Sequence, residues 1–214
     1  MIKAIIFDVD GVLVDSVGIL IDYYQKTAKV LGLRVPPRIE LLKLLGRPLD
    51  EIVKTTWPGK DLKLIMSTYR KFFLDGSITI PPVKGAAESV KKCKQSGFKI
   101  GIVSSKIKFF IKRHLKEANF DLNLFDAIVS AEDTEKNKPD PEPLIYACNL
   151  LNVRPEEVIY IGDALADFES ARGAKIKFIG VLTGGLDEKD FKENGVEDVL
   201  ASVAELPSFL KVGA

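Results

Sequence analysis

Two carboxylates separated by one residue follow an apolar run near the start of the chain. Ala4 to Phe7 lead directly into Asp8 and Asp10, and Gly11 comes next. Two carboxylates this close repel each other unless a cation lies between them, and hard oxygen ligands of this kind suit Mg²⁺. Asp-x-Asp-Gly is also a common turn signal, so this stretch alone leaves both a metal site and a simple loop open.

Further polar side chains occupy corresponding places later in the chain. Ser104 follows one apolar run, Lys138 lies in a loop after another, and Asp163 and Asp167 follow a third. Each has an ordinary explanation, as a turn serine, a solvated lysine or a strand exit. Together they make a phosphoryl-transfer set. One carboxylate attacks phosphorus, a second handles protons, a hydroxyl and an ammonium hold the phosphoryl oxygens, and further carboxylates hold a metal.

The elements around these residues predict an α/β fold. Residues 4–7 form a continuous apolar run, which is typical of a buried parallel strand. Residues 16–80 show helical spacing without a convincing strand, and Pro81-Pro82 mark the return. Helices and strands then alternate, so the carboxyl ends of the strands meet at one edge of a parallel sheet. We expect strands at 98–103, 127–129, 158–161, 177–182 and near Val199. We expect helices at 85–96, 107–118 and 144–151, another helix that ends at Ala174, and a last helix that closes the chain. Asp140 is the expected N-cap of the helix that contains 144–151.

Composition narrows the class of partner. The chain has 214 residues, 46% of them hydrophobic, and a net charge of +1. Neither nucleic acid nor an anionic membrane is indicated, so a small-molecule ligand is expected, with the protein a monomer or a weak dimer. Cys93 and Cys148 lie in helical patterns without metal-site spacing, and we expect them as core residues in a reducing compartment, the cytoplasm. The start of the chain does not resemble a signal peptide, and no apolar run is long enough to span a bilayer.

Four motifs in order resemble the haloacid dehalogenase superfamily. They are Asp8-Val-Asp10-Gly-Val-Leu, Ile102-Val-Ser104, Lys138-Pro-Asp-Pro and Gly162-Asp163-Ala-Leu-Ala-Asp167. The resemblance covers the whole chain. It implies a Rossmann-like parallel sheet flanked by helices, with an inserted small α-helical cap. The core domain would comprise residues 1–15 and 81–214, and the cap residues 16–80. The insertion is similar to the cap of subfamily I, which contains phosphoglycolate phosphatases and β-phosphoglucomutases.

The resemblance also implies roles for the matching residues. Asp8 would be a nucleophile that forms an aspartyl-phosphate, and Asp10 would protonate the leaving oxygen and then deprotonate the attacking water. Mg²⁺ would be held by the Asp8 carboxylate, the Asp10 backbone carbonyl and Asp163. Ser104 and Lys138 would bind the phosphoryl group, with Asp167 orienting a metal-bound water or Lys138. Family dehalogenases lack the second aspartate, because carbon–halogen cleavage needs no protonated leaving oxygen, so Asp10 favours phosphate esters.

The resemblance predicts a Mg²⁺-dependent phosphatase acting on small phosphorylated metabolites, either phosphoglycolate-like compounds or sugar phosphates. The alternative is a β-phosphoglucomutase-type mutase. Family mutases carry a histidine where this chain has Leu20 and an acidic pair where it has Gly162-Asp163, which favours hydrolysis, whereas Val12 and Ser104-Ser105 resemble the mutase motifs. A third interpretation, a catalytically silent binding module, is disfavoured by the intact nucleophile, acid and metal ligand.

Arg47 is the candidate for substrate choice. It lies in the break 45–49 between two cap helices, where it would grip a second anionic or polar group, although a surface arginine is an equal alternative. We expect the cap to move about residues 15–16 and 81–82.

Other conspicuous residues are interpreted as structural. His114 is expected on the solvated face of a charged helix. Lys106 follows Ser104-Ser105 closely enough to approach the phosphate, but the favoured interpretation is a surface residue at a helix start. Trp57, Tyr69, Phe72 and Phe73 are expected in the core of the cap.

Overall fold

A six-stranded parallel sheet forms the centre of the computed structural model, which describes residues 1–75 and 79–212. The strand order is β3-β2-β1-β4-β5-β6. The four residues of β1 are fully buried, because β2 and β4 pair with β1 on either side and helices cover both faces. The strands are β1 (Ala4–Phe7), β2 (Lys99–Val103), β3 (Ala127–Val129), β4 (Val158–Gly162), β5 (Lys177–Val181) and β6 (Asp198–Leu200).

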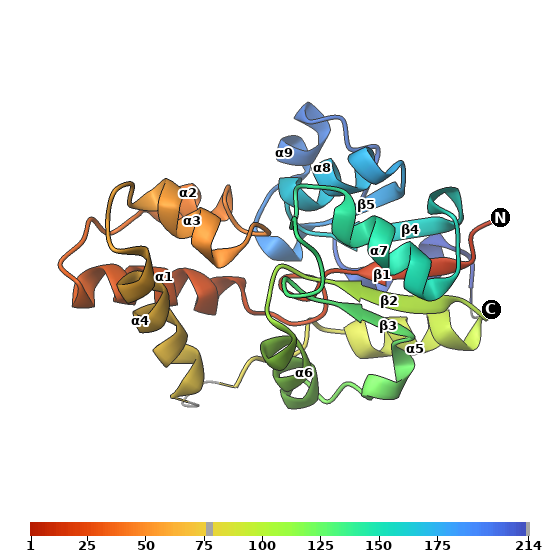
Figure 1. Ribbon diagram of the computed structural model, residues 1–214. Helices are drawn as coiled ribbons and strands as arrows, with labels where there is room; N and C mark the ends of the chain where they lie inside the picture. Colours follow the sequence, from red (N-terminus) through yellow and green to blue (C-terminus); the bar gives the residue numbers. More distant parts are fainter. Residues whose placement is uncertain (76–78, 213–214) are drawn as a thin grey trace.

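Two layers of helices bury alternate strand residues. Ile5 and Phe7 point into a core shared with α5 (Ala86–Gln95) and α6 (Lys108–Glu117), whereas Ala4 and Ile6 point into the core under α7 (Glu142–Leu151) and α8 (Leu165–Ala174). Cys93 and Cys148 lie one in each core, as expected. The predicted fold class is therefore confirmed (Figure 1). The smaller helices are α9 (Glu188–Glu193), α10 (Leu206–Phe209), η1 (Leu122–Leu124), η2 (Pro155–Glu157), η3 (Leu182–Gly184) and η4 (Val203–Glu205).

The helices inserted after β1 lie beyond the carboxyl edge of the sheet, while both ends of the chain lie at the opposite side (Figure 1). They are α1 (Val17–Val30), α2 (Arg38–Leu42), α3 (Leu49–Thr56) and α4 (Leu62–Leu74). Aromatic side chains hold α1 to α4, since the Tyr23 ring packs 4.8 Å from Phe73 and 6.3 Å from Tyr69 between centroids. This placement suits the predicted cap of residues 16–80, in which 76–78 lie outside the described residues. The division into two domains stays a prediction.

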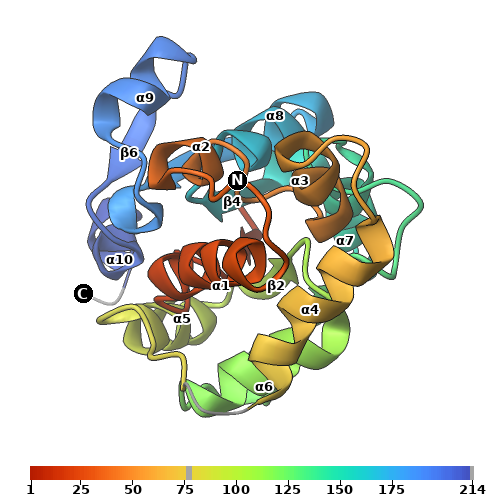
Figure 2. The same cartoon turned by 90° about the vertical axis from the view of Figure 1, so that its left-hand side faces the viewer.

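The insertion leaves and rejoins the core at one place. The Asp15 N–H donates to the Pro81 carbonyl at 2.8 Å, and the Val83 N–H donates to the Leu13 carbonyl at 2.9 Å. Val14 pairs with Pro82 in the same antiparallel contact. Figure 2, viewed from the side of the insertion, shows α4 beside α6 as the second point of approach. There the Phe73 and Phe110 ring centroids lie 5.2 Å apart.

The observed elements differ from the sequence expectations chiefly at their ends. The helix expected to begin directly after Asp140 begins at Glu142. The Asp140 side chain still accepts the Glu142 N–H at 3.0 Å, although Asp140 lies one position before the N-cap residue, Pro141. The α9 helix was not expected from the sequence. Within residues 1–75 and 79–212, no helix combines the length and apolar character needed to cross a membrane.

Candidate active site

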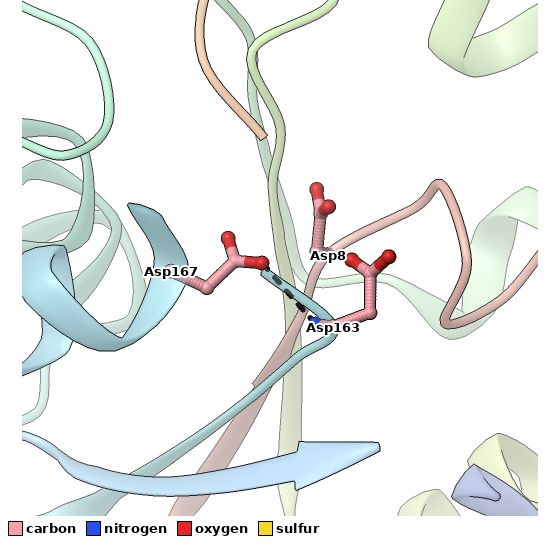
Figure 3. Close-up of side chains that lie close together, drawn as sticks. All are labelled: Asp8, Asp163 and Asp167. Atoms are coloured by element: carbon pink, nitrogen blue, oxygen red, sulfur yellow. Dashed lines mark hydrogen bonds between the residues drawn. The ribbon is translucent and has the colours of Figure 1, made fainter. Parts of the chain in front are cut away.

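Asp8 and Asp163 meet at the carboxyl edge of the sheet. Asp8 directly follows β1 and Asp163 directly follows β4, and these two strands are neighbours. Strand order reverses at this point, which is where open α/β sheets bind ligands. Asp167 approaches the same place from the first turn of α8 (Figure 3). One carboxylate oxygen from each of the three lies within 4.8 Å of the others, and all three residues are buried.

Asp167 has both carboxylate oxygens occupied by donors from the protein. Its Oδ1 accepts from Lys138 Nζ at 2.6 Å and from the Tyr160 hydroxyl at 2.7 Å. Its Oδ2 accepts from the backbone N–H groups of Asp163 at 3.2 Å and Ala164 at 3.1 Å. Asp167 therefore fixes Lys138 and the start of α8, and its lone pairs are committed.

Asp8 keeps one buried oxygen without a hydrogen-bond partner among the described residues. Asp8 Oδ1 lies 3.1 Å from Lys138 Nζ but makes no hydrogen bond within the described chain. Burial raises the pKa of Asp8 to about 7, with the charges of Asp167 and Asp10 adding to the shift and Lys138 opposing it. Burial and neighbouring carboxylates also raise the pKa of Asp163 well above its usual range. Carboxyl groups this unfavourable to ionise fit a site built to receive a cation.

Two glycines make room for the Asp163 side chain. A Cβ added at Gly11 or Gly184 would collide with the Asp163 carboxylate, and Gly11 also has a φ of +67°. The chain thus approaches Asp163 closely from two sides. The donor set of Asp8 and Asp163, with oxygens only, fits a hard divalent cation such as Mg²⁺.

Lys138 and Ser104 reach the same site, as the sequence predicted for their position. The Lys138 side chain is 1% exposed. Burial would lower its pKa, but the charges of Asp167 and Asp8 outweigh this and raise the pKa of Lys138, which stays an ammonium. Ser104 is buried at the end of β2 and lines the same cavity as Asp8. A hydroxyl and an ammonium therefore flank Asp8, a suitable arrangement for phosphoryl oxygens.

Lys106 and His114 do not lie where the sequence analysis expected them. Lys106 Nζ donates to Asp10 Oδ1 at 2.5 Å and lies 2.9 Å from His114 Nδ1. His114 is 2% exposed, with its ring centroid 5.6 Å from Phe73 and 5.9 Å from Phe110. The solvated and surface interpretations of these two residues are therefore wrong. The signal was present for His114, which follows Phe110 by four positions on the apolar face of α6.

Charge and burial act differently on the members of this group. Burial would raise the pKa of Asp10, but the ammonium of Lys106 and hydrogen bonds from Lys106 and Ser16 lower it below the usual value. Burial lowers the pKa of His114 to about 3, and the charge of Lys106 adds to this. His114 is thus a neutral imidazole at ordinary pH, and its Nδ1 is the acceptor for the Lys106 ammonium.

A cavity of about 310 Å³ joins these groups to the inserted helices. Arg47 lines it, as predicted for the residue's location, and its guanidinium pairs with Glu51 one turn away. Tyr69 and Phe73 belong to the aromatic core of the insertion, as expected, but they also line the cavity. Apolar and aromatic residues from the inserted helices line one side of the cavity: Val17, Leu20, Tyr24, Ile52, Met66, Tyr69 and Phe73.

Comparison with known proteins identifies the family. The model of the family described as haloacid dehalogenase-like hydrolase matches residues 5–181. The chain belongs to this family. The resemblance noted from the four motifs is thus confirmed, and so is the predicted enzyme class, a hydrolase of phosphatase type.

Individual relatives extend over the whole chain. A pyrophosphatase PpaX from Halalkalibacterium halodurans is 30% identical over 214 residues, covering 100% of this chain and 99% of the relative. A phosphoglycolate phosphatase from Nitrosospira multiformis is 26% identical over 222 residues, covering 98% and 96%. The crystal structure of a hydrolase from Pseudomonas syringae superposes with a TM-score of 0.89 at 23% identity, covering 98% of each chain, and shares the fold.

Proposed function

We propose that this protein is a Mg²⁺-dependent phosphatase that hydrolyses phosphate monoesters of small metabolites through an aspartyl-phosphate on Asp8. The observation that carries the proposal is the convergence of Asp8, Asp10, Ser104, Lys138 and Asp163 on one cavity. These residues come from four separate stretches of the chain. Their types match the attacking group, the proton carrier, the phosphoryl ligands and the metal ligand of phosphoryl transfer.

Each side chain then has one task. The Asp8 carboxylate attacks phosphorus, and its buried position between Lys138 and Asp163 suits a group that becomes covalently modified. Lys138 and Ser104 hold the non-reacting phosphoryl oxygens. Asp10, whose pKa Lys106 and Ser16 lower in the free protein, takes up a proton when the substrate phosphate binds, gives it to the leaving oxygen, and then takes one from the water that cleaves the aspartyl-phosphate. Asp167 keeps the Lys138 ammonium in place.

Asp8, Asp163 and the backbone carbonyl of Asp10 are the proposed ligands of Mg²⁺. The unpartnered Asp8 oxygen and the close glycines at positions 11 and 184 support this assignment. Asp167 lies in the same carboxylate cluster, but its oxygens are taken by other donors, so we assign it no direct contact with the metal. A bound Mg²⁺ would neutralise negative charge on the phosphoryl group.

Two features favour hydrolysis over the mutase alternative. Leu20, at the place of the mutase histidine, lines the cavity and carries no group that could exchange a proton. Gly162, at the place of the first residue of the acidic pair, has no room for a side chain, because an added Cβ would lie 2.5 Å from Asp167 Cβ. An acidic residue there would displace Asp167 and with it Lys138.

The named relatives suggest the substrates to test first. Pyrophosphate and phosphoglycolate head the set, followed by sugar phosphates, with Arg47 as the proposed contact for the part of the substrate away from the phosphoryl group. The testing experiment is hydrolysis of p-nitrophenyl phosphate with Mg²⁺ by the wild-type protein and by Asp8→Asn. We expect the variant to lose roughly 10³-fold or more in kcat while keeping its melting temperature. Wild-type-like rates in Asp8→Asn would reject the proposal.

A further inference from the structure

The cation nearest to the proposed proton donor is not one of the motif residues. Lys106 lies in the loop after β2, and its ammonium lies 2.5 Å from Asp10 Oδ1, at the lining of the cavity. We propose that Lys106 is a substrate-binding residue that selects phosphate compounds with a second anionic group next to the scissile oxygen. This inference rests on the proposed function, because Asp10 marks the leaving-group side of the site.

Neighbouring side chains hold the Lys106 side chain in one position. His114 Nδ1 accepts from the ammonium at 2.9 Å, and the imidazole packs against the rings of both Phe73 and Phe110. The Phe73 ring lies 5.7 Å from the ammonium, and the Lys106 side chain is only 14% exposed. A lysine side chain normally loses much rotamer freedom when it binds a ligand, and here that freedom is already restricted.

Lys106 also keeps a donor for a ligand. An ammonium has three N–H groups, and within the described chain Asp10 and His114 account for two of them. Next to the ammonium, the Phe73 ring and other apolar side chains line the cavity, and an anion that met only these side chains would be poorly compensated. Two further cations of the cavity lining, Arg47 and Arg70, come from the inserted residues and can meet a more distant part of a substrate, whereas Lys106 contacts Asp10 itself.

The geometry therefore distinguishes substrates by charge close to the reacting bond. In pyrophosphate the leaving oxygen itself belongs to a second phosphate, and in phosphoglycolate one carbon separates it from a carboxylate. Both place an anionic oxygen where the Lys106 ammonium lies beside Asp10. A neutral alcohol such as a sugar hydroxyl offers only a weaker, uncharged hydrogen bond at this position.

The test compares two ligands that share a two-carbon chain, 2-phosphoglycolate and 2-hydroxyethyl phosphate. Their affinities are measured by titration calorimetry with Mg²⁺ in an Asp8→Asn background, where neither is turned over. We expect a preference of about 10- to 100-fold for 2-phosphoglycolate, which Lys106→Met should remove. Lys108→Met is the matched control, because Lys108 lies two residues after Lys106 but pairs with Asp133, outside the cavity lining. This variant should keep the preference.

Variants that separate a structural role from a recognition role complete the design. Lys106→Gln keeps a hydrogen-bond donor for Asp10 without the charge and should also lose the preference. It replaces Lys106→Met in the test if that variant does not fold. His114→Phe keeps the ring packing but removes the acceptor, so it should reduce the preference without abolishing it, and should add nothing to Lys106→Met. This ratio between two ligands would not change if His114 were merely structural.

One result would overturn the inference: an unchanged preference for 2-phosphoglycolate in Lys106→Met. If both ligands were weakened equally, Lys106 would be left with a role only in holding Asp10, and if neither were weakened, it would have no part in binding. Failure of the proposed function has a different signature, since it would appear as absent turnover in the wild-type protein, whereas the binding preference is measured without turnover.

Discussion

The buried carboxylate of Asp167 should be intolerant even of an amide. Asp167→Asn keeps the volume but replaces one acceptor oxygen by an NH₂ donor. Each hydrogen-bond partner of this carboxylate among the described residues is a donor: Lys138 and the Tyr160 hydroxyl on one side, and the N–H groups of Asp163 and Ala164 on the other. Whichever way the amide turns, two donors face its NH₂ group, and the negative charge opposite Lys138 is lost. Removing one partner of a buried ion pair costs about 3–5 kcal/mol, so we expect about 3 kcal/mol of destabilisation because Asp8 still faces Lys138.

The assay is urea unfolding followed by circular dichroism at pH 7 in the presence of a chelator, together with thermal melting. A loss of about 3 kcal/mol corresponds to roughly 6–12 °C in melting temperature for a chain of this length. Tyr160→Phe removes one donor and should cost about 1 kcal/mol. Asp50→Asn, in the exposed Asp50–Lys54 pair, should cost less than about 0.5 kcal/mol. If Asp167→Asn were no less stable than Asp50→Asn, the account of this network would be refuted.

Three further outcomes are expected. Arg47→Ala should raise KM for phosphoglycolate while leaving p-nitrophenyl phosphate kinetics unchanged, and equal effects on both substrates would reject the specificity role. Chelation should abolish turnover and Mg²⁺ should restore it better than Ca²⁺, whose larger ligand number would crowd the attacking oxygen; full activity in excess chelator would contradict the metal assignment. Because burial holds the pKa of His114 near 3, below its unfolded value of 6.5, the unfolded state binds the extra proton and stability falls as pH drops below 6.5. This contribution amounts to about 2 kcal/mol between pH 8 and pH 5, and it should be absent from the urea-unfolding profile of His114→Phe.

The parts of the fold that the sequence predicted are those with strong local signals. The buried strand at Ala4–Phe7 has a continuous apolar run, and the three-residue strand at 127–129 has the expected bounds. The helix α9 was missed because Asp187 and Asp190 cap a short charged segment whose only buried residue is Phe191. A helix of six residues has too few turns to show an apolar face.

The candidate site was predictable where residue type and topology coincide. Asp8, Ser104 and Asp163 each follow a strand, so parallel pairing alone brings them to one edge. The contact between Lys106 and His114 could not be predicted in this way. It depends on Phe73 of α4, which packs against the imidazole of His114 and lies near the Lys106 ammonium. Contacts between helices that are far apart in the chain produce no regular residue spacing from which they could be predicted.

Trapping the covalent species tests the central claim most directly. The wild-type protein is mixed with p-nitrophenyl phosphate and Mg²⁺, quenched in acid during turnover, digested and mapped by mass spectrometry. We expect a phosphorylated peptide with the added mass on Asp8, absent from the same digest of Asp8→Asn. Steady turnover without any modified peptide, or with the phosphoryl group on another residue, would contradict it.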